Sequence, residues 1–319
     1  MQEKSGRATA GKTRQKGRRG SAGQLARTIL PRGWRIRNAN GIALLECSAL
    51  AKVRGVVHGF TLRAGGASEL DGCRAFNLGR TDWDTPEAVA RNRRLLLDAM
   101  GRGRMQLLPQ RQIHSDIVRR FDAVPPETLQ GDAVISSTPG LLLGVLTADC
   151  VPILLADTRH RAVAAIHAGW RGTLKRIAAK ALGRMKMEFS THPRDVIAAL
   201  GPSIGQCCYE VGIEVVQAFH AQFENARDFF DGPFDRLVAD DSPNPLQWLN
   251  MHPPGHQPPP PRAHLDLIAA NRRQLEDAGV LPRSIHSSGL CTSCRKDLFF
   301  SHRAEHGRTG RLMGVIGLR

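Results

Sequence analysis

The stretch LLLGVLTADCVPILLADTRHRAVAAIHAGWRG, residues 141–172, decides the fold class. It contains three short apolar runs, at 141–146, 151–156 and 162–166, each with the length of a buried β-strand. Polar residues between the second and third runs predict a tight turn. A helix is expected from about 170 to 187, because apolar residues recur there at helical spacing. The sequence therefore predicts a layered, mixed α/β domain.

The segments on either side extend this pattern. Thr85 and Pro86 supply an N-cap and a first-turn proline for a helix that runs to about Met100. The glycine-rich segment 63–68 predicts a turn. We expect the remaining elements to complete one mixed sheet and its covering helices. They are strands at 54–61, 196–200, 284–287 and 313–318 and helices at 213–223 and 265–278.

Length and composition predict one principal domain. The chain has 319 residues, of which 41% are hydrophobic. No apolar run approaches the roughly 18 residues that a membrane-spanning helix needs, so we expect no membrane span. We divide the chain into a basic tail at 1–40 and a catalytic domain at 41–319. Eight prolines within 241–262 predict a surface loop inserted in that domain.

The positive charge is concentrated in the tail. Residues 1–38 carry eleven Lys and Arg against Glu3 alone, and the whole chain has a formal net charge of +16. This Gly- and Arg-rich segment with few apolar residues is typical of disorder. A nucleic-acid-binding arm is the alternative, but Trp34 is its one aromatic residue, so only nonspecific contacts are expected. A transit peptide is a further alternative, which the many glycines disfavour.

Three scattered side chains form a candidate metal site. His114, Cys150 and His167 each stand where a strand meets a loop. Two imidazoles and one thiolate suit zinc in an open catalytic site, with a fourth position for water or substrate. Taken singly, each would be a hydrogen-bonded core histidine or a small buried cysteine. Their common context favours the metal site.

Neighbouring polar residues suggest supporting roles. Asp149 would orient a ligand imidazole or relay a proton, or simply form a turn. Arg171 stands at a helix start, where backbone N–H groups and a guanidinium favour an anion such as phosphate. A buried salt bridge from Arg171 to Glu210 is the alternative.

The remaining cysteines give no second metal site in this interpretation. Cys291 and Cys294 form a C-x-x-C pair without a matching second pair at zinc-ribbon spacing. Cys207 and Cys208 are adjacent, and we expect them to be poorly placed to chelate a metal together. The sequence holds seven cysteines and no export signal, which predicts free thiols in a reducing compartment, the cytoplasm.

A set of motifs in order along the chain resembles the YfiH-type laccase-domain family, also described as multicopper polyphenol oxidase-like and as purine nucleoside phosphorylases. The motifs are HGFTLRAGGAS from His58, FNLG from Phe76, QIHS from Gln112, LTADCVPILLAD from Leu146, AAIHAGWRG from Ala164, GPSIGQCCYEVG from Gly201, LDLIAANRRQL from Leu265 and CTSCRKDLFFSHR from Cys291. Small departures are Ile113, where valine is usual, and His302, where tyrosine often stands.

The resemblance implies a single α/β domain with zinc held by His114, Cys150 and His167. It also implies phosphorolysis of adenosine, inosine and S-methyl-5'-thioadenosine, and deamination of adenosine. In our hypothesis zinc lowers the pKa of a water towards about 7 for attack on adenine C6, while Asp149 moves protons.

Substrate and phosphate binding is assigned to four further positions, Arg63, Asn77, Arg171 and Glu210. Arg171 is the first candidate for holding phosphate, and it joins Cys150 and Asp149 as a catalytic residue. Two rival functions stay open. One is a copper-dependent polyphenol oxidase, since two histidines and a cysteine also occur in blue-copper sites. The other is a zinc amidase acting on peptidoglycan precursors.

Overall fold

The computed structural model describes residues 29–101, 105–108, 110–238 and 262–319. Residues 31–319 form one compact unit, to which the following description refers. Most of the predicted tail and nearly all of the proline-rich segment lie outside the described residues. None of the described helices is both long and apolar enough to cross a membrane.

Two six-stranded sheets pack face to face in this unit. The first has the order β1-β2-β3-β19-β11-β6 and the second the order β18-β14-β12-β13-β10-β8. The strands of the first sheet are β1 (Trp34–Ala39), β2 (Ile42–Cys47), β3 (Val56–Thr61), β19 (Leu312–Leu318), β11 (Leu141–Thr147) and β6 (Gln106–Leu107). Those of the second are β18 (Ile285–Ser287), β14 (Val196–Leu200), β12 (Val151–Asp157), β13 (Val163–Ala168), β10 (Ala133–Ser136) and β8 (Val118–Arg120).

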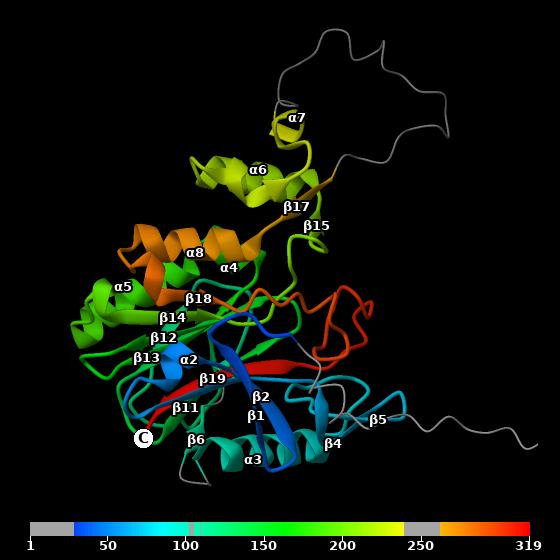
Figure 1. The fold of residues 1–319 in the computed structure, drawn as a ribbon, viewed down its shortest axis with the longest axis vertical. Coiled ribbons are helices and arrows are strands. Elements are labelled where there is room, and N and C mark those ends of the chain that lie inside the picture. Colours follow the sequence, from blue (N-terminus) through cyan, green and yellow to red (C-terminus); the bar gives the residue numbers. More distant parts are fainter. Residues whose placement is uncertain (1–28, 102–104, 109, 239–261) are drawn as a thin grey trace, which may run out of the picture. The chain divides into compact units, whose positions relative to one another are not determined.

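Helices cover the two outer faces of this pair of sheets (Figure 1). Helix α3 packs on the first sheet, and α5 and α8 lie on the second. Smaller strands form three accessory sheets, β15-β17-β16, β4-β5 and β7-β9. The helices are α2 (Ser48–Ala51), α3 (Pro86–Gly101), α4 (Trp170–Leu174), α5 (Ile177–Phe189), α6 (Ile213–Gln222), α7 (Phe234–Val238) and α8 (Leu267–Asp277). The accessory strands are β4 (Ala64–Leu70), β5 (Cys73–Ala75), β7 (Gln110–Arg111), β9 (Leu129–Gln130), β15 (Glu210–Val211), β16 (Phe230–Asp231) and β17 (Ala263–Leu265).

The predicted mixed α/β class is confirmed, but the expectation of one sheet is wrong. The apolar runs β11 and β12 follow each other in sequence and belong to different sheets. Between them Asp149 has a φ of 91°, which turns the chain from one layer into the other. Every residue of β12 is buried, because this strand lies between the first sheet and the covering helices.

Three further sequence expectations need correction. The helix expected at 170–187 is broken into α4 and α5, because Arg176 takes a left-handed φ of 61° between them. The segment 63–68 is more than a turn, since most of it forms strand β4 against β5.

The tail boundary at residue 40 is also wrong, because β1 lies within it and pairs with β2. The sequence analysis missed this strand because its arginines made it look like part of the basic tail. Arg35 and Arg37 both pair with Glu46 of β2, while Trp34 is buried with its ring 5.8 Å from that of Phe60.

The second sheet brings six segments to one edge. Its strand pairings place the beginnings of β8, β10 and β12 beside the ends of β13, β14 and β18. Loops that are far apart in sequence therefore meet along this edge, in the same order as the strands. The candidate site is built there.

Candidate metal centre

The three predicted ligands converge at this edge. The ligand atoms of His114, Cys150 and His167 all lie within 4.8 Å of one another. Cys150 Sγ is 4.0 Å from His114 Nε2, and the two imidazole rings are 4.9 Å apart in an edge-to-face arrangement. His167 is only 4% exposed, whereas His114 is exposed. The group is thus anchored on one side and open to solvent on the other.

Local backbone geometry explains why these residues meet. His114 precedes β8 with a left-handed φ of 57°, a conformation that costs a non-glycine residue energy and needs support from its surroundings. Cys150 comes directly before β12, and His167 of β13 lies opposite Pro152 of β12. Gly169 makes room for the group, since a Cβ there would lie 2.9 Å from Cys150 Sγ and 3.2 Å from the His114 ring.

Asp132 is the supporting residue that sequence reasoning missed. It is fully buried, and its Oδ1 lies 2.8 Å from His167 Nδ1. The same carboxylate accepts hydrogen bonds from the backbone N–H groups of Ile113, His114 and Ser115. It therefore fixes one imidazole ring directly and the strained backbone of the other histidine.

This finding corrects one role considered for Asp149, because Asp132 orients the ligand imidazole. The sequence did carry a signal for it. Asp132 directly precedes the buried run of β10, and the antiparallel register of β10 and β13 brings it beside His167. The position of Asp132 is a local signal, but the register that places it beside His167 is not, so the sequence did not identify the pair.

The electrostatics favour a thiolate at Cys150. Burial would raise its pKa, but the positive charge of His167 and hydrogen bonds from both histidines lower it to about 6. Burial would likewise lower the pKa of His167, yet the Cys150 charge and the Asp132 carboxylate raise it. For Asp132, burial is outweighed by its bonds to His167 and Ser115, which hold its pKa below the usual range.

Asp149 organises the neighbouring loops. Its Oδ1 accepts a hydrogen bond from Thr292 Oγ1 and its Oδ2 one from the backbone N–H of Arg303, each at 2.7 Å. Its backbone carbonyl accepts from the N–H of Ile204. Asp149 thus ties the Cys150 segment to the connection between β18 and β19 through its carboxylate, and to the loop after β14 through its backbone carbonyl. A part in proton transfer stays a prediction.

Arg171 does not form the buried salt bridge to Glu210 that we considered. Its side chain is exposed, and its guanidinium carbon lies 4.4 Å from the centroid of the Trp170 ring. Glu210 pairs with Arg262 instead. Within the described ranges no carboxylate forms an ion pair with Arg171. Its charge remains available to an anion.

The other two predicted binding residues are engaged with the protein. Arg63 pairs with Glu305 at 2.9 Å and donates to the backbone carbonyl of Lys296. Asn77 is fully buried, and its amide bridges Asp84 and the backbone of Arg311. The structure gives both residues a structural role, while a contact with substrate stays a prediction.

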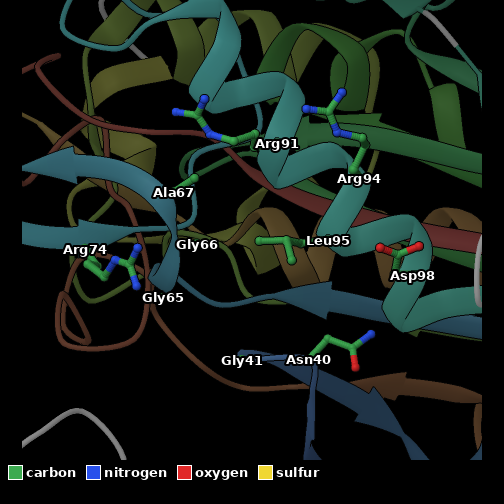
Figure 2. A pocket seen from close by; sticks show the side chains of 10 residues that line it. All are labelled: Asn40, Gly41, Gly65, Gly66, Ala67, Arg74, Arg91, Arg94, Leu95 and Asp98. Carbon is green, nitrogen blue, oxygen red and sulfur yellow. The ribbon is translucent and has the colours of Figure 1, made fainter.

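A cavity of about 610 Å³ lies apart from these ligands. Figure 2 shows the charged residues that line it, which are Arg91, Arg94 and Asp98 of α3 and Arg74 of β5. None of the three metal-ligand candidates lines it. Three arginines make this cavity positively charged, and it is separate from the His/Cys/His centre.

The converging residues fit a zinc ion. Nitrogen and sulfur donors are those that zinc prefers, and three protein ligands with an exposed side leave a coordination position open. A ligand histidine whose other ring nitrogen bonds a carboxylate is a recurring feature of zinc enzymes. Asp132 provides that bond to Nδ1 of His167, which leaves Nε2 for the metal.

Fold and centre together define an α/β protein with a His/Cys/His metal-binding edge. Residues 57–319 match the family described as multi-copper polyphenol oxidoreductase laccase, so the chain belongs to this family. The resemblance found in the motifs is thereby confirmed.

Relatives with curated names are purine nucleoside phosphorylases and a deaminase. The chain is 36% identical over 280 residues to a purine nucleoside phosphorylase of Deinococcus radiodurans, covering 88% of this chain and 94% of that one. It is 38% identical over 214 residues to an adenosine deaminase from an unknown prokaryotic organism, covering 64% and 72%. The crystal structure of YlmD from Geobacillus stearothermophilus superposes with a TM-score of 0.72 at 30% identity, covering 91% of this chain and all of that one.

Proposed function

We propose that this protein is a zinc-dependent purine nucleoside phosphorylase that also deaminates adenosine. The convergence of His114, Cys150 and His167 on an edge supported by Asp132 carries the proposal. The names of the relatives supply the substrate class, purine nucleosides with phosphate. The proposed nucleosides are adenosine, inosine and S-methyl-5'-thioadenosine, and the proposed compartment is the cytoplasm, where free thiols persist.

Each ligand has a separate task in this proposal. His167, held by Asp132, presents a fixed Nε2, and Cys150 presents a thiolate. His114 closes the set from the exposed side. A bound zinc ion would supply Lewis-acid chemistry that makes water nucleophilic near neutral pH, as deamination at C6 of adenine requires.

Phosphorolysis needs an anion site beside the sugar. Phosphate forms a bond to C1' while the bond from C1' to the purine nitrogen breaks, and the base leaves with the electron pair. Arg171 is exposed on the helix that follows His167, and its guanidinium would hold two phosphate oxygens. Asp149 would take up or release a proton, and Arg63, Asn77 and Glu210 would shape the substrate-binding surface.

The deciding experiment follows the products from adenosine. Metal-analysed protein is incubated with adenosine, with and without phosphate, and adenine, inosine and hypoxanthine are separated by chromatography. We expect adenine only with phosphate and inosine in both cases. Cys150→Ala should lose both products together with one equivalent of metal, whereas Cys73→Ala, at an exposed position, should behave as wild type. Full activity of Cys150→Ala would refute the site.

The rival functions can be tested with the same purified protein. If zinc-loaded protein turns over no nucleoside, phenol oxidation by copper-loaded protein would support the oxidase that the family description names. Release of amino acids from a peptidoglycan precursor would support the amidase. A salt-dependent affinity for RNA or DNA that disappears on deleting residues 1–28 would assign nucleic-acid contacts to the tail.

A further inference from the structure

Four cysteines form a second cluster beside the centre described above. The sulfur atoms of Cys207, Cys208, Cys291 and Cys294 all lie within 4.8 Å of one another. This overturns the expectation that the C-x-x-C pair lacks a partner pair and that Cys207 and Cys208 are poorly placed to chelate together. The adjacent cysteines are the missing pair, since their sulfurs are 3.7 Å apart and face Cys294.

The separations among the sulfurs of Cys207, Cys208 and Cys294 match those around a tetrahedral metal, and the sulfur of Cys291 lies within 4.8 Å of all three. Cys294 Sγ lies 3.6 Å from Cys207 Sγ and 3.4 Å from Cys208 Sγ. A regular tetrahedron with zinc–sulfur bonds of about 2.3 Å has sulfurs about 3.8 Å apart. Bonded sulfurs in a disulfide are only about 2.05 Å apart. The cluster is therefore arranged around a shared centre and not as two covalent pairs.

The fold brings these two loops together in a defined way. Strands β14 and β18 are parallel neighbours, so the loops that follow them leave at the same edge of the sheet. A bridge between Ser203 and Cys291 continues this pairing beyond the strands. The cluster thus rests on backbone pairing between residues that are 87 or 88 positions apart in sequence, which explains why cysteine spacing alone did not reveal it.

The backbone at Gly205 is fitted to the sulfurs. Its N–H donates a hydrogen bond to Cys291 Sγ at 3.2 Å, the type of contact that stabilises a thiolate ligand. A Cβ at this position would lie 3.2 Å from Cys291 Cβ and 3.3 Å from Cys207 Sγ. The N–H groups of Cys208 and Tyr209 both donate to the Gly205 carbonyl, which curls this loop around the cluster.

We propose that Cys207, Cys208, Cys291 and Cys294 bind one zinc ion in a closed, structural site, distinct from the His/Cys/His centre. Four thiolates complete a tetrahedral coordination and leave no position for substrate. Tetrahedral sulfur sites are taken by zinc or by iron. The proposal rests on the sulfur geometry and does not depend on which reaction the first centre catalyses.

The ion would hold the loops that border the catalytic edge. Thr292, next to Cys291, donates to the Asp149 carboxylate, and Asp149 directly precedes Cys150. The ring of Tyr209, next to Cys208, lies 5.4 Å from the Arg303 guanidinium, and the backbone N–H of Arg303 donates to the Asp149 carboxylate. Loss of the second ion should therefore loosen the segment that carries Cys150 without removing any of the first centre's ligands.

Metal counting tests the proposal directly. Wild-type protein purified under reducing conditions should hold two zinc ions per chain, as measured by inductively coupled plasma mass spectrometry. Cys150→Ala and the double variant Cys208→Ser/Cys294→Ser should each hold one, and their combination none. A double variant with the wild-type metal content would overturn the proposal. So would the finding of iron in place of zinc, or of a disulfide within the cluster in freshly purified, anaerobically handled protein.

A second measurement leaves the cluster untouched, in case its double variant does not fold. Cobalt is exchanged into Cys150→Ala, whose remaining site should give the strong visible absorption and sulfur-to-cobalt charge transfer of tetrahedral thiolate coordination. Absence of these bands in a folded, cobalt-treated sample would contradict the proposal. Titration of the unfolded, chelator-treated wild-type chain should count seven reactive thiols, all those of the sequence. A count of five or fewer would indicate disulfides and overturn it.

Discussion

The two clusters at the edge of the second sheet differ in what surrounds their ligands. The His/Cys/His centre has three ligands, an exposed histidine and a buried aspartate behind it. The cysteine cluster has four sulfur ligands, and its support comes from the backbone N–H of Gly205. The first arrangement leaves room for a reacting molecule, and the second closes on itself. Of two neighbouring sites on one edge, the first can thus serve a reaction and the second can stabilise the fold.

The comparison also shows what positions the ligands in each of the two clusters. Asp132 is a single charged group that positions His114 and His167 together. The cysteine cluster depends on how two parallel strands deliver their loops. Substitutions that disturb the support of one cluster should leave the other cluster intact. The following predictions test whether the two clusters are independent, from the largest expected effect to the smallest.

The largest effect is expected from Gly169→Ala. Its new Cβ would lie 2.9 Å from Cys150 Sγ, so the ligand must move, and displacing a reacting group by about 1 Å costs activity about 100-fold. The cysteine cluster should keep its metal. Gly205→Ala should do the reverse, lowering the second metal equivalent and the melting temperature. Elemental analysis and initial rates measure both.

Gly183→Ala is the matched control for these two variants. A Cβ at Gly183 meets no atom within 4 Å, and its helical position should make alanine more stable by about 1 kcal/mol. Equal loss of both metals in Gly169→Ala and Gly205→Ala would show that the two clusters are one unit and would break the comparison.

The next effect concerns the buried aspartate. Asp132→Asn keeps the shape but removes the charge opposite His167 Nδ1, and loss of such a partner lowers metal affinity about 10- to 100-fold. Competition with a coloured chelator measures that affinity. The control is Asp157→Asn at the far end of β12, a buried aspartate that also accepts from backbone N–H groups. If both variants lose metal equally, Asp132 acts through general stability alone.

The sequence predicted the fold class and the three ligands because each signal was local. Continuous apolar runs identified β11, β12 and β13, and two of the candidate ligands stand at the ends of such runs, Cys150 directly before β12 and His167 near the end of β13. The division into two sheets was missed, because it depends on a turn at Asp149 whose conformation is set by contacts with Thr292 and Arg303.

The features that the sequence could not predict depend on which strands pair and in which register. The contact of Asp132 with His167 needs the register of β10 against β13, and the cysteine cluster needs the parallel neighbours β14 and β18. Neither register has a local signature, because both join segments tens of residues apart. Asn77 is a further case, since its predicted contact with substrate stays a prediction, while the structure shows that its buried amide bonds to the backbone of Gly79.

A third prediction concerns the order in which metal is lost. With an excess of a water-soluble chelator, the ion of the His/Cys/His centre should leave first, because three protein ligands hold it, whereas four thiolates hold the second ion. One equivalent and nearly all activity should disappear together, while the melting temperature falls little. The second equivalent should leave only with a thiol-reactive mercurial, which then lowers the melting temperature. Simultaneous release of both would contradict the assigned roles.

The smallest effect tests a buried histidine that has no metal partner. His58 accepts a hydrogen bond from the backbone N–H of Cys47, and burial lowers its pKa to about 4; Arg35 and Arg37 act in the same direction and Glu46 opposes them.

Because the unfolded chain binds this proton near pH 6.5, the folded state should lose stability as the pH falls from about 6.5 to about 4, by up to about 3 kcal/mol. His58→Gln keeps an acceptor for the Cys47 N–H but cannot take up a proton, so its free energy of unfolding should fall less in that window than that of the wild type. Denaturant unfolding of the metal-free proteins at several pH values measures the difference. Parallel curves would mean that the folded protein accepts a charged His58, and that burial at this position does not keep the imidazole neutral.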